Sequence, residues 1–420
     1  MAADHDVVIV GAGAAGIAAG RRLASSPLSF LIVEAGDRVG GRAWTRIIEG
    51  MPLDLGCGWL HSADRNPWTA VAEEAGFEID RTPPAWGRQF EELGFSRAEQ
   101  AEANEAWEAL DRRLRESPPA SDRAADALDP DGRWNAYIDA RSGYINGAGL
   151  ADISVADYLA YDDADSDVNW RLPGGYGALV AASAEGLPIR FGTAVTRIDR
   201  RGAPMTLETA QGTLTARAVI VTVPPPVLAR GQLRFDPALD DKVKAAEVLP
   251  LGLANKLFLA LDAPDEFPPD CHLIGSKRTA ETGSHYLRPF GRPVIETFFG
   301  GAHAWALEAE GEAGAVDFAV EELAALLGSS FRKRVRPLAL SAWGKAPYVA
   351  GAYSHARPGH AAARARLASA VEDRIFFAGE ACSASDFSTA HGAHDSGVSA
   401  AEAVLRALGL AVAEAQAAAG

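Results

Sequence analysis

The stretch that most constrains the fold lies at the start of the chain, where two short strands flank a glycine-rich turn and a helix. The apolar run 6–10 predicts a buried parallel strand, and apolar residues follow at helical spacing from 17 to 23. Between them lies Gly11-Ala12-Gly13-Ala14-Ala15-Gly16, and the next strand, 30–33, ends at Glu34. Glycine-rich turns occur in other α/β enzymes, but the acid at this distance favours a dinucleotide site.

Each element of this pattern has a physical task. Gly11 permits the tight turn, Gly13 lets backbone N–H groups approach a pyrophosphate, and Gly16 allows close packing of helix on strand. Glu34 is placed to accept a hydrogen bond from a ribose hydroxyl. The pair Gly40-Gly41 then suits a second pass of backbone near the pyrophosphate, and Arg42 can bind a phosphate with its guanidinium fork.

Composition narrows the class of protein. A chain of 420 residues is long enough for two domains with large cores. Its net charge of −16 argues against binding to nucleic acid or to an anionic membrane. The three cysteines are scattered, which indicates neither a disulfide framework nor a metal site, and we expect a reducing, cytoplasmic location. No apolar run reaches about 18 residues, so no membrane span is expected.

The segment 33–45, with Gly40-Gly41-Arg42, resembles the flavin-containing amine oxidase family of monoamine, polyamine and spermine oxidases and flavin-type histone demethylases. The resemblance covers nearly the whole chain and includes a second FAD signature, Gly379-Glu380, at the end of a strand. It implies an α/β fold, with a Rossmann-like (GR2-type) FAD-binding domain and a discontinuous α+β substrate-binding domain. The expected FAD-binding pieces are 1–80, 186–238 and 345–420, and the expected substrate-binding pieces are 81–185 and 239–344.

The resemblance also implies which residues contact FAD. They lie in the glycine-rich turn, after the second strand, in the segment that runs beneath the flavin, in the middle of the chain and near its C-terminus. The expected contacts are Gly11, Gly13, Ala14, Ala15, Gly16, Glu34, Ala35, Arg38, Gly40, Gly41, Arg42, Gly56, Cys57, Gly58, Trp59, Val195, Thr222, Pro224, Trp343, Gly379, Glu380, Thr389, Ala390 and Ala393.

Lys256 is the first candidate catalytic residue. The run 253–261 is apolar on both faces, which predicts a strand covered on both sides. Because an unpaired buried ammonium is costly, Lys256 either reaches water from the strand end or lines a polar cavity. The match to the Asn/Thr-Lys strand motif of the family favours the cavity. It implies that Lys256 holds a water against flavin N5, a role that fits a pKa shifted by burial.

Other candidates surround the expected substrate. Tyr353 matches the aromatic residue that stands before the flavin, and Phe387 and Thr389 are expected beside the amine. Monoamine oxidases carry a cysteine where this chain has Ala352, so the resemblance implies that FAD is bound non-covalently. His61 has two interpretations: a catalytic or substrate-binding group in the amine tunnel, or a loop histidine that caps the helix near 66–67.

The resemblance implies an FAD-dependent amine oxidase. A hydride passes from the α-carbon of a neutral primary or secondary amine, polyamine- or monoamine-like, to flavin N5. The imine hydrolyses to an aldehyde or ketone, and O2 reoxidises the flavin with release of hydrogen peroxide. The expected partners are thus a small-molecule amine and O2, with no nucleic acid and no membrane. Which amine is oxidised, and whether the chain is a monomer or a homodimer, stays open.

Three alternatives remain on the sequence alone. An amino-acid oxidase or an FAD-dependent desaturase can share both FAD signatures. An amino-acid oxidase needs an arginine at the substrate carboxylate, which Arg278, Arg288 or Arg292 can supply. The second alternative is a protein that binds FAD without turnover, and the third is a nicotinamide-linked reductase.

Overall fold

The glycine-rich turn follows a central strand of an eight-stranded sheet. The computed structural model describes residues 3–412. In it, β1 (His5–Val10) lies between β10 (Gly212–Val221) and β2 (Phe30–Val33) and is parallel to both. The strand order is β11-β8-β9-β10-β1-β2-β7, and β17 also pairs with β10. The other strands are β7 (Ile189–Arg190), β8 (Val195–Asp199), β9 (Met205–Thr209), β11 (Arg234–Asp236) and β17 (Ile375–Phe377).

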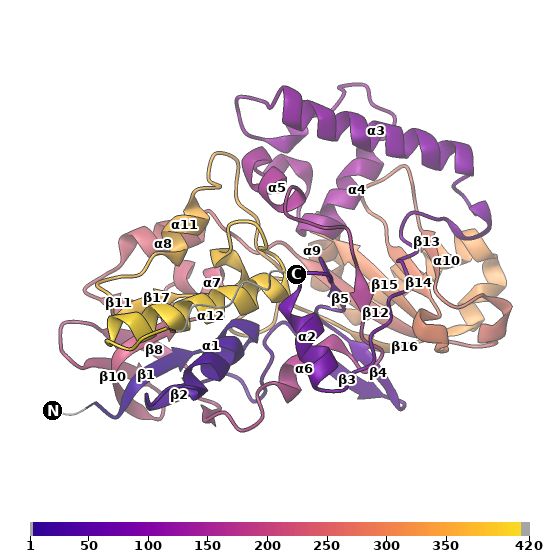
Figure 1. Ribbon diagram of the computed structural model, residues 1–420. Helices are drawn as coiled ribbons and strands as arrows, with labels where there is room; N and C mark the ends of the chain where they lie inside the picture. Colours follow the sequence, from indigo (N-terminus) through magenta and orange to yellow (C-terminus); the bar gives the residue numbers. More distant parts are fainter. Residues whose placement is uncertain (1–2, 413–420) are drawn as a thin grey trace, which may run out of the picture.

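Both faces of this sheet are covered, as the unbroken apolar runs predict. Val7 and Ile9 pack with residues of α1 (Ala14–Ala24) and α12 (Ala390–Ala407), and Val8 and Val10 pack on the opposite face. That second face is covered by α7 (Pro225–Ala229), α8 (Asp240–Glu247) and α11 (Ala363–Ala368). The N-terminal α1 and the C-terminal α12 lie side by side (Figure 1). A Cβ at Gly397 would lie 2.1 Å from the carbonyl oxygen of Ala15, so this close approach requires glycine.

A second, antiparallel sheet contains Lys256. Its strand order is β13-β14-β15-β12-β16. The strands are β12 (Ala254–Leu261), β13 (Cys271–Ile274), β14 (Ser284–Leu287), β15 (Val294–Gly300) and β16 (Val335–Leu340). Leu257 and Leu259 face a core shared with α9 (Gly301–Glu310) and α10 (Glu312–Leu327), and Phe258 packs on the other side. Every residue of β12 is buried, which confirms the strand predicted there.

Three helices stand over the second sheet and form a separate small core (Figure 1). They are α3 (Arg97–Glu116), α4 (Asn135–Asn146) and α5 (Val155–Asp162). A capping box begins α3, because Ser96 accepts from the backbone N–H of Glu99 and the Glu99 carboxylate accepts from that of Ser96. Ala103 and Leu110, seven residues apart on one face of α3, are buried in this core.

Short elements connect the two sheets. The hairpin β3 (Thr45–Ile48) and β4 (Met51–Asp54) leads to β5 (Trp59–Leu60), which pairs with β6 (Trp170–Arg171). The remaining helices are α2 (Pro67–Glu74) and α6 (Tyr176–Ala182).

The division into two domains stays a proposal. The packing places two helices with the eight-stranded sheet, outside the substrate-binding pieces to which the proposed boundaries assign them. Leu179 and Val180 of α6, and Ala245 and Ala246 of α8, pack in the cores of the eight-stranded sheet, although the expected limits assigned both helices to the substrate domain. Within residues 3–412, no helix is both long and apolar enough to cross a membrane. In the same range no cluster of three or more side chains has the make-up of a metal site.

Candidate active site

The glycine-rich turn leaves space above the N-terminus of α1. Gly11 has φ of +111°, and a Cβ there would lie 2.5 Å from Oγ1 of Thr222 on the next strand. Gly13 pairs with Gly40 in an isolated parallel bridge, so two glycine turns lie against each other. The first N–H groups of α1 have no partner within the helix. The turn is therefore shaped to receive a phosphate on backbone donors.

Glu34 joins the two loops at the adenosine end of the predicted site. Its Oε2 accepts from the N–H of Ala12 at 2.8 Å, and its Oε1 accepts from the N–H of Gly36 at 2.8 Å. These two hydrogen bonds fix the carboxylate at the end of β2 while each oxygen keeps a free lone pair. Glu34 can therefore still accept from a ribose hydroxyl, as the sequence predicts.

A second anchor comes from the C-terminal part of the chain. Oε1 of Glu380 accepts from Nη1 of Arg42 at 2.8 Å, and Oε2 accepts from Ser354 Oγ at 2.6 Å and from the N–H of Ser388 at 2.9 Å. Arg42 also donates to the carbonyl of Ala352 at 2.7 Å. The two FAD signatures, far apart in the sequence, thus hold each other in place. The Glu380 carboxylate, one of the expected FAD contacts, is largely used for this purpose.

A cavity of about 1100 Å³ runs from the glycine-rich turn to the second sheet and the helices above it. Its volume is larger than that of a usual small-molecule site, which is roughly 300–1,000 Å³. One end has the backbone donors of two glycine turns and the guanidinium groups of Arg38 and Arg42, and the other end has aromatic side chains. Phosphates fit the first end and an apolar ring the second, so the residues present fit FAD together with a small substrate.

All but one of the predicted cofactor and substrate residues line this cavity. The exception is Gly16, where a Cβ would lie 1.9 Å from the carbonyl oxygen of Gly11, so its task is close packing of α1 on the turn. The predicted residues that line the cavity are Gly11, Gly13, Ala14, Ala15, Glu34, Ala35, Arg38, Gly40, Gly41, Arg42, Gly56, Cys57, Gly58, Trp59, His61, Val195, Thr222, Pro224, Lys256, Trp343, Tyr353, Gly379, Glu380, Phe387, Thr389, Ala390 and Ala393.

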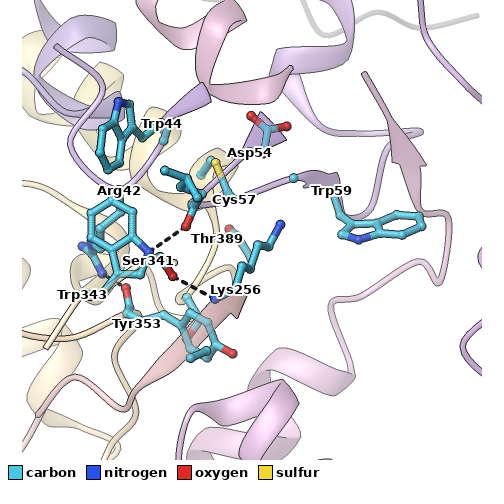
Figure 2. A pocket seen from close by; sticks show the side chains of 18 of the residues that line it. Arg42, Trp44, Asp54, Cys57, Trp59, Lys256, Ser341, Trp343, Tyr353 and Thr389 are labelled. Atoms are coloured by element: carbon cyan, nitrogen blue, oxygen red, sulfur yellow. Dashed lines mark hydrogen bonds between the residues drawn. The ribbon is translucent and has the colours of Figure 1, made fainter. Parts of the chain in front are cut away.

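Lys256 reaches into the cavity from β12 and does not extend to bulk water (Figure 2). It is only 6% exposed, and its Nζ lies 2.9 Å from Oε1 of Glu296 on β15. A Cβ at Gly58 would lie 2.9 Å from the same Nζ, so glycine leaves the room that the ammonium occupies. The interpretation of Lys256 as a strand-end lysine that snorkels to water is therefore wrong.

The charges around Lys256 decide its protonation. Burial alone would lower the Lys256 pKa, but the carboxylates of Glu296 and Asp54 together raise it above its ordinary value. Burial also raises the pKa of Asp54, which accepts from the N–H groups of Tyr176 and Gly177 at the start of α6. The sequence predicted a pKa shift caused by burial; the structure shows that neighbouring acids reverse its sign. Lys256 is thus a cation at neutral pH.

Aromatic side chains form the wall near Lys256. Trp343 donates its indole N–H to the carbonyl of Leu55 at 2.8 Å and meets Trp44 edge to face. Tyr353 lies beside Lys256 at the cavity (Figure 2). Its hydroxyl donates to the carbonyl of Tyr144 on α4, which fixes the ring there. Such a wall offers an apolar surface to a planar ring and to an uncharged amine.

His61 lines the cavity and does not cap α2. The N-cap is Asn66, whose side-chain oxygen accepts from the N–H of Trp68. The Nδ1 of His61 lies 2.6 Å from Oδ1 of Asn169. Burial lowers the pKa of His61, so the ring is neutral at pH 7. Of the two interpretations of His61, the structure leaves the one that places it in the cavity.

Two residues predicted to contact the substrate already make contacts with other groups of the protein. Thr389 caps α12: its hydroxyl accepts from the N–H of Gly392 and donates to the carbonyl of Asp386. Phe387 is 4% exposed, and its ring lies over the buried guanidinium of Arg364 at 3.5 Å. Both line the cavity, but the Thr389 hydroxyl is already engaged.

The sequence reasoning missed Asp54 and Glu296. Asp54 lay inside the segment predicted to run beneath the flavin, and an acid there next to glycines was a usable signal. Glu296 had none, because its proximity to Lys256 depends on how β15 pairs with β12. Together the two acids surround the lysine that the sequence did identify.

The arginines named for an amino-acid oxidase are differently placed. Arg278 and Arg288 do not line the cavity. Arg292 does, but its two terminal nitrogens donate to the backbone carbonyls of Pro52 and Pro173 at 2.7 and 2.6 Å. None of the three presents a free guanidinium fork to a substrate.

Comparison with known proteins agrees with this geometry. A family model described as flavin containing amine oxidoreductase matches residues 14–117 and 85–405. Polyamine oxidase 4 of Oryza sativa subsp. japonica is 29% identical over 437 residues, which cover 96% of this chain and 88% of that protein. Polyamine oxidase 2 of Arabidopsis thaliana is 29% identical over 435 residues, covering 94% and 87% respectively.

Two further similarities are to a histone demethylase homologue and to a solved structure. Lysine-specific histone demethylase 1 homolog 1 of Oryza sativa subsp. japonica is 29% identical over 450 residues, covering 96% of this chain but 52% of that longer protein. Among solved structures, wild-type putrescine oxidase bound to putrescine superimposes with a TM-score of 0.78 at 20% identity, covering 96% of this chain and 99% of that one. The structural likeness shows a shared fold.

Proposed function

The chain belongs to the flavin containing amine oxidoreductase family and is an FAD-dependent amine oxidase; we propose that it oxidises a small alkylamine of the diamine or polyamine kind. The observation that carries the proposal is a single cavity that joins the glycine-rich turn to an aromatic pocket containing Lys256. Polyamine oxidases are among the most similar relatives, which supports this class of substrate.

Acidic side chains near His61 also support a substrate with more than one nitrogen. Asp165 and Asp167 line the cavity, and Asp165 is close enough to act on the charge of His61. They follow α5 on the loop that returns to β6. A second, protonated nitrogen of a diamine would be attracted to carboxylates at this end of the cavity, while the reacting nitrogen lies at the aromatic wall.

The aromatic wall has a further task, which is to favour the uncharged amine. An alkylamine resembles lysine, with a pKa of about 10.4, and neutralising it at pH 7 costs roughly 4–5 kcal/mol. Trp59 and Tyr353 at the cavity surface disfavour the cation by replacing water with apolar rings. The nearby cation Lys256 acts in the same direction, because like charges repel.

We propose that the two glycine turns and Arg42 hold the pyrophosphate of FAD and that Glu34 holds its ribose. The bound flavin supplies the redox chemistry, accepting a hydride from the amine α-carbon and passing electrons to O2. Non-covalent binding is supported by Ala352, which has no nucleophile. It is also supported by Cys57, whose thiol has a pKa raised by burial to about 12 and stays protonated.

For the other candidate residues we propose supporting roles. Lys256 orders a water beside the flavin or assists its reoxidation. His61, as a neutral ring oriented by Asn169, provides a polar contact to the substrate. Hydrogen peroxide is the expected reduced product of O2. A reducing, cytoplasmic location is supported by the cysteines Cys57, Cys271 and Cys382, all of which are free.

Anaerobic bleaching of the flavin by a panel of amines tests the proposal. Putrescine, spermidine and spermine should bleach the bound flavin faster than arylalkylamines or α-amino acids do. Admission of air should then restore the colour, with peroxide detected by a coupled peroxidase. Acid precipitation should release free FAD into the supernatant. Bleaching by α-amino acids alone would contradict the substrate class, and flavin retained in the pellet would contradict non-covalent binding.

A further inference from the structure

One arm of the cavity extends away from Lys256 and between the helices above the second sheet. On α4, Tyr137, Arg141 and Tyr144 all line it, and their spacings of four and three residues place them on one face of the helix. Trp107 of α3 and Tyr158 of α5 line the same arm. No residue of this arm has a role in the function proposed above, apart from the contact that Tyr144 makes with Tyr353.

Arg141 is a cation without an anionic partner. Its guanidinium lies over the ring of Trp107 at 4.1 Å. Within residues 3–412, it has no carboxylate within 4.0 Å and makes no side-chain hydrogen bond to protein. By contrast, three other arginines of the cavity, Arg42, Arg171 and Arg292, each hold a carboxylate or backbone carbonyls. Stacking on Trp107 orients the guanidinium edge but leaves its N–H donors unused.

Two phenol groups lie near Arg141. Its charge acts on the ionisation of both Tyr137 and Tyr158, which places the three groups together. Neither hydroxyl makes a hydrogen bond to the described part of the chain. Burial raises the pKa of both phenols, so each keeps its proton and can donate. The arm therefore gathers a guanidinium and two hydroxyl donors in one place.

Two acids lie near the arm, and one of them, Asp162, lines the cavity. Asp111 and Asp162 both act on the ionisation of Tyr158, but both are paired with Arg115, a separate arginine at the end of α3. The donors of the arm are thus left for a ligand. A carboxylate has two planar acceptor oxygens that match a guanidinium fork, and the phenols can complete its hydrogen bonding.

We propose that Arg141, with Tyr137 and Tyr158, forms a carboxylate subsite, so that the enzyme also oxidises amines that carry a carboxylate at their far end. This inference rests on the amine oxidase function and adds a second class of substrate to the proposed diamines and polyamines. The Tyr144 carbonyl, three residues or about 4.5 Å along α4 from Arg141, accepts from Tyr353 at the aromatic wall. A short ω-aminocarboxylate can therefore span from the wall to the arm.

Steady-state kinetics of the FAD-loaded full-length enzyme test the subsite. Its substrates are ω-aminocarboxylates from 4-aminobutanoate to 8-aminooctanoate, each compared with the alkylamine and the diamine of the same chain length. At one chain length, kcat/KM for the aminocarboxylate should exceed that for the alkylamine by roughly ten- to a hundredfold, as expected for a charge-assisted hydrogen-bonded pair. In Arg141→Gln that ratio should fall to near one, and Arg141→Lys should restore part of it.

A matched control is Arg112→Gln on the outer side of α3, where the side chain is 60% exposed and should leave the ratio unchanged. Hexanoate, a carboxylate without an amine, provides a binding test: it should perturb the flavin absorption of the wild type and not of Arg141→Gln. Equal kcat/KM for the aminocarboxylate and the alkylamine in the wild type, or equal loss on all three substrate types in Arg141→Gln, would overturn the subsite. Oxidation of the plain alkylamine would in that case leave the amine oxidase function standing.

Discussion

The ammonium nitrogen of Lys256 lies 2.9 Å from a carboxylate oxygen of Glu296, on the neighbouring strand of the second sheet. In the pairing of β12 with β15, Glu296 is opposite Phe258, two residues along from Lys256. Residues at this diagonal lie on the same face of the sheet and within reach of long side chains. The pair therefore results from strand register, and Lys256 enters the cavity as one half of an ion pair.

The first prediction concerns that partner. Glu296→Gln removes a carboxylate that raises the Lys256 pKa, so the effect of burial should prevail and the pKa should fall. If the rate of flavin reoxidation depends on the protonation of Lys256, the apparent pKa in its pH profile should then move to lower pH. Stopped-flow reoxidation between about pH 6 and 10 measures it. An unmoved profile would show that Glu296 does not control this charge.

The second prediction concerns Lys256 itself. Lys256→Met should keep FAD bound, because methionine fills a similar volume, but should slow flavin reduction or reoxidation by roughly tenfold or more. Anaerobic and aerobic stopped-flow measurements separate the two half-reactions. Lys244→Met, at an exposed position of α8, is the control and should behave as wild type. Unchanged rates in both half-reactions of Lys256→Met would refute a functional role.

The third prediction concerns the adenosine end. Glu34→Gln places an NH2 group opposite the N–H of Ala12 or of Gly36, so one of two hydrogen bonds is replaced by a clash of donors. FAD affinity should fall by roughly tenfold or more, measured by fluorescence titration of the apoprotein. Glu185→Gln, an exposed residue far from the turn in sequence, should bind FAD as wild type does. Equal affinity in both variants would exclude Glu34 as a determinant of binding.

The fourth prediction concerns the acid stability of the fold. Burial, and then the nearby His285, lower the pKa of His272 to about 3, against an ordinary value of 6.5. Between about pH 6.5 and 3 the unfolded chain binds more protons at this site, so the free energy of unfolding falls as pH falls, by up to about 1.4 kcal/mol per pH unit. His272→Gln, which can still bond to Ser284, should show a shallower decline.

Denaturant unfolding of the holoenzyme at several pH values measures this slope. The control is His360→Gln, at an exposed position, which should keep the wild-type dependence. If His272→Gln loses stability with pH as steeply as wild type, His272 is not a source of the acid sensitivity.

Local patterns were sufficient for the cofactor end of this protein. Strand, glycine turn, helix and acid follow one another within some thirty residues, and each step depends on backbone geometry that neighbouring residues impose. The burial of the strand that carries Lys256 also followed from a local pattern, because a strand that is apolar on both faces must be covered on both. Those features needed no knowledge of distant contacts.

Only the tertiary structure decided what surrounds the lysine and where the substrate arm leads. Glu296 meets Lys256 through strand register, and Asp54 approaches it from a hairpin some two hundred residues earlier. Arg141 enters the cavity because α4 packs between α3 and the second sheet. A sequence displays which residues are charged, but the sign and size of their effect depend on long-range packing, which sets distance and burial together.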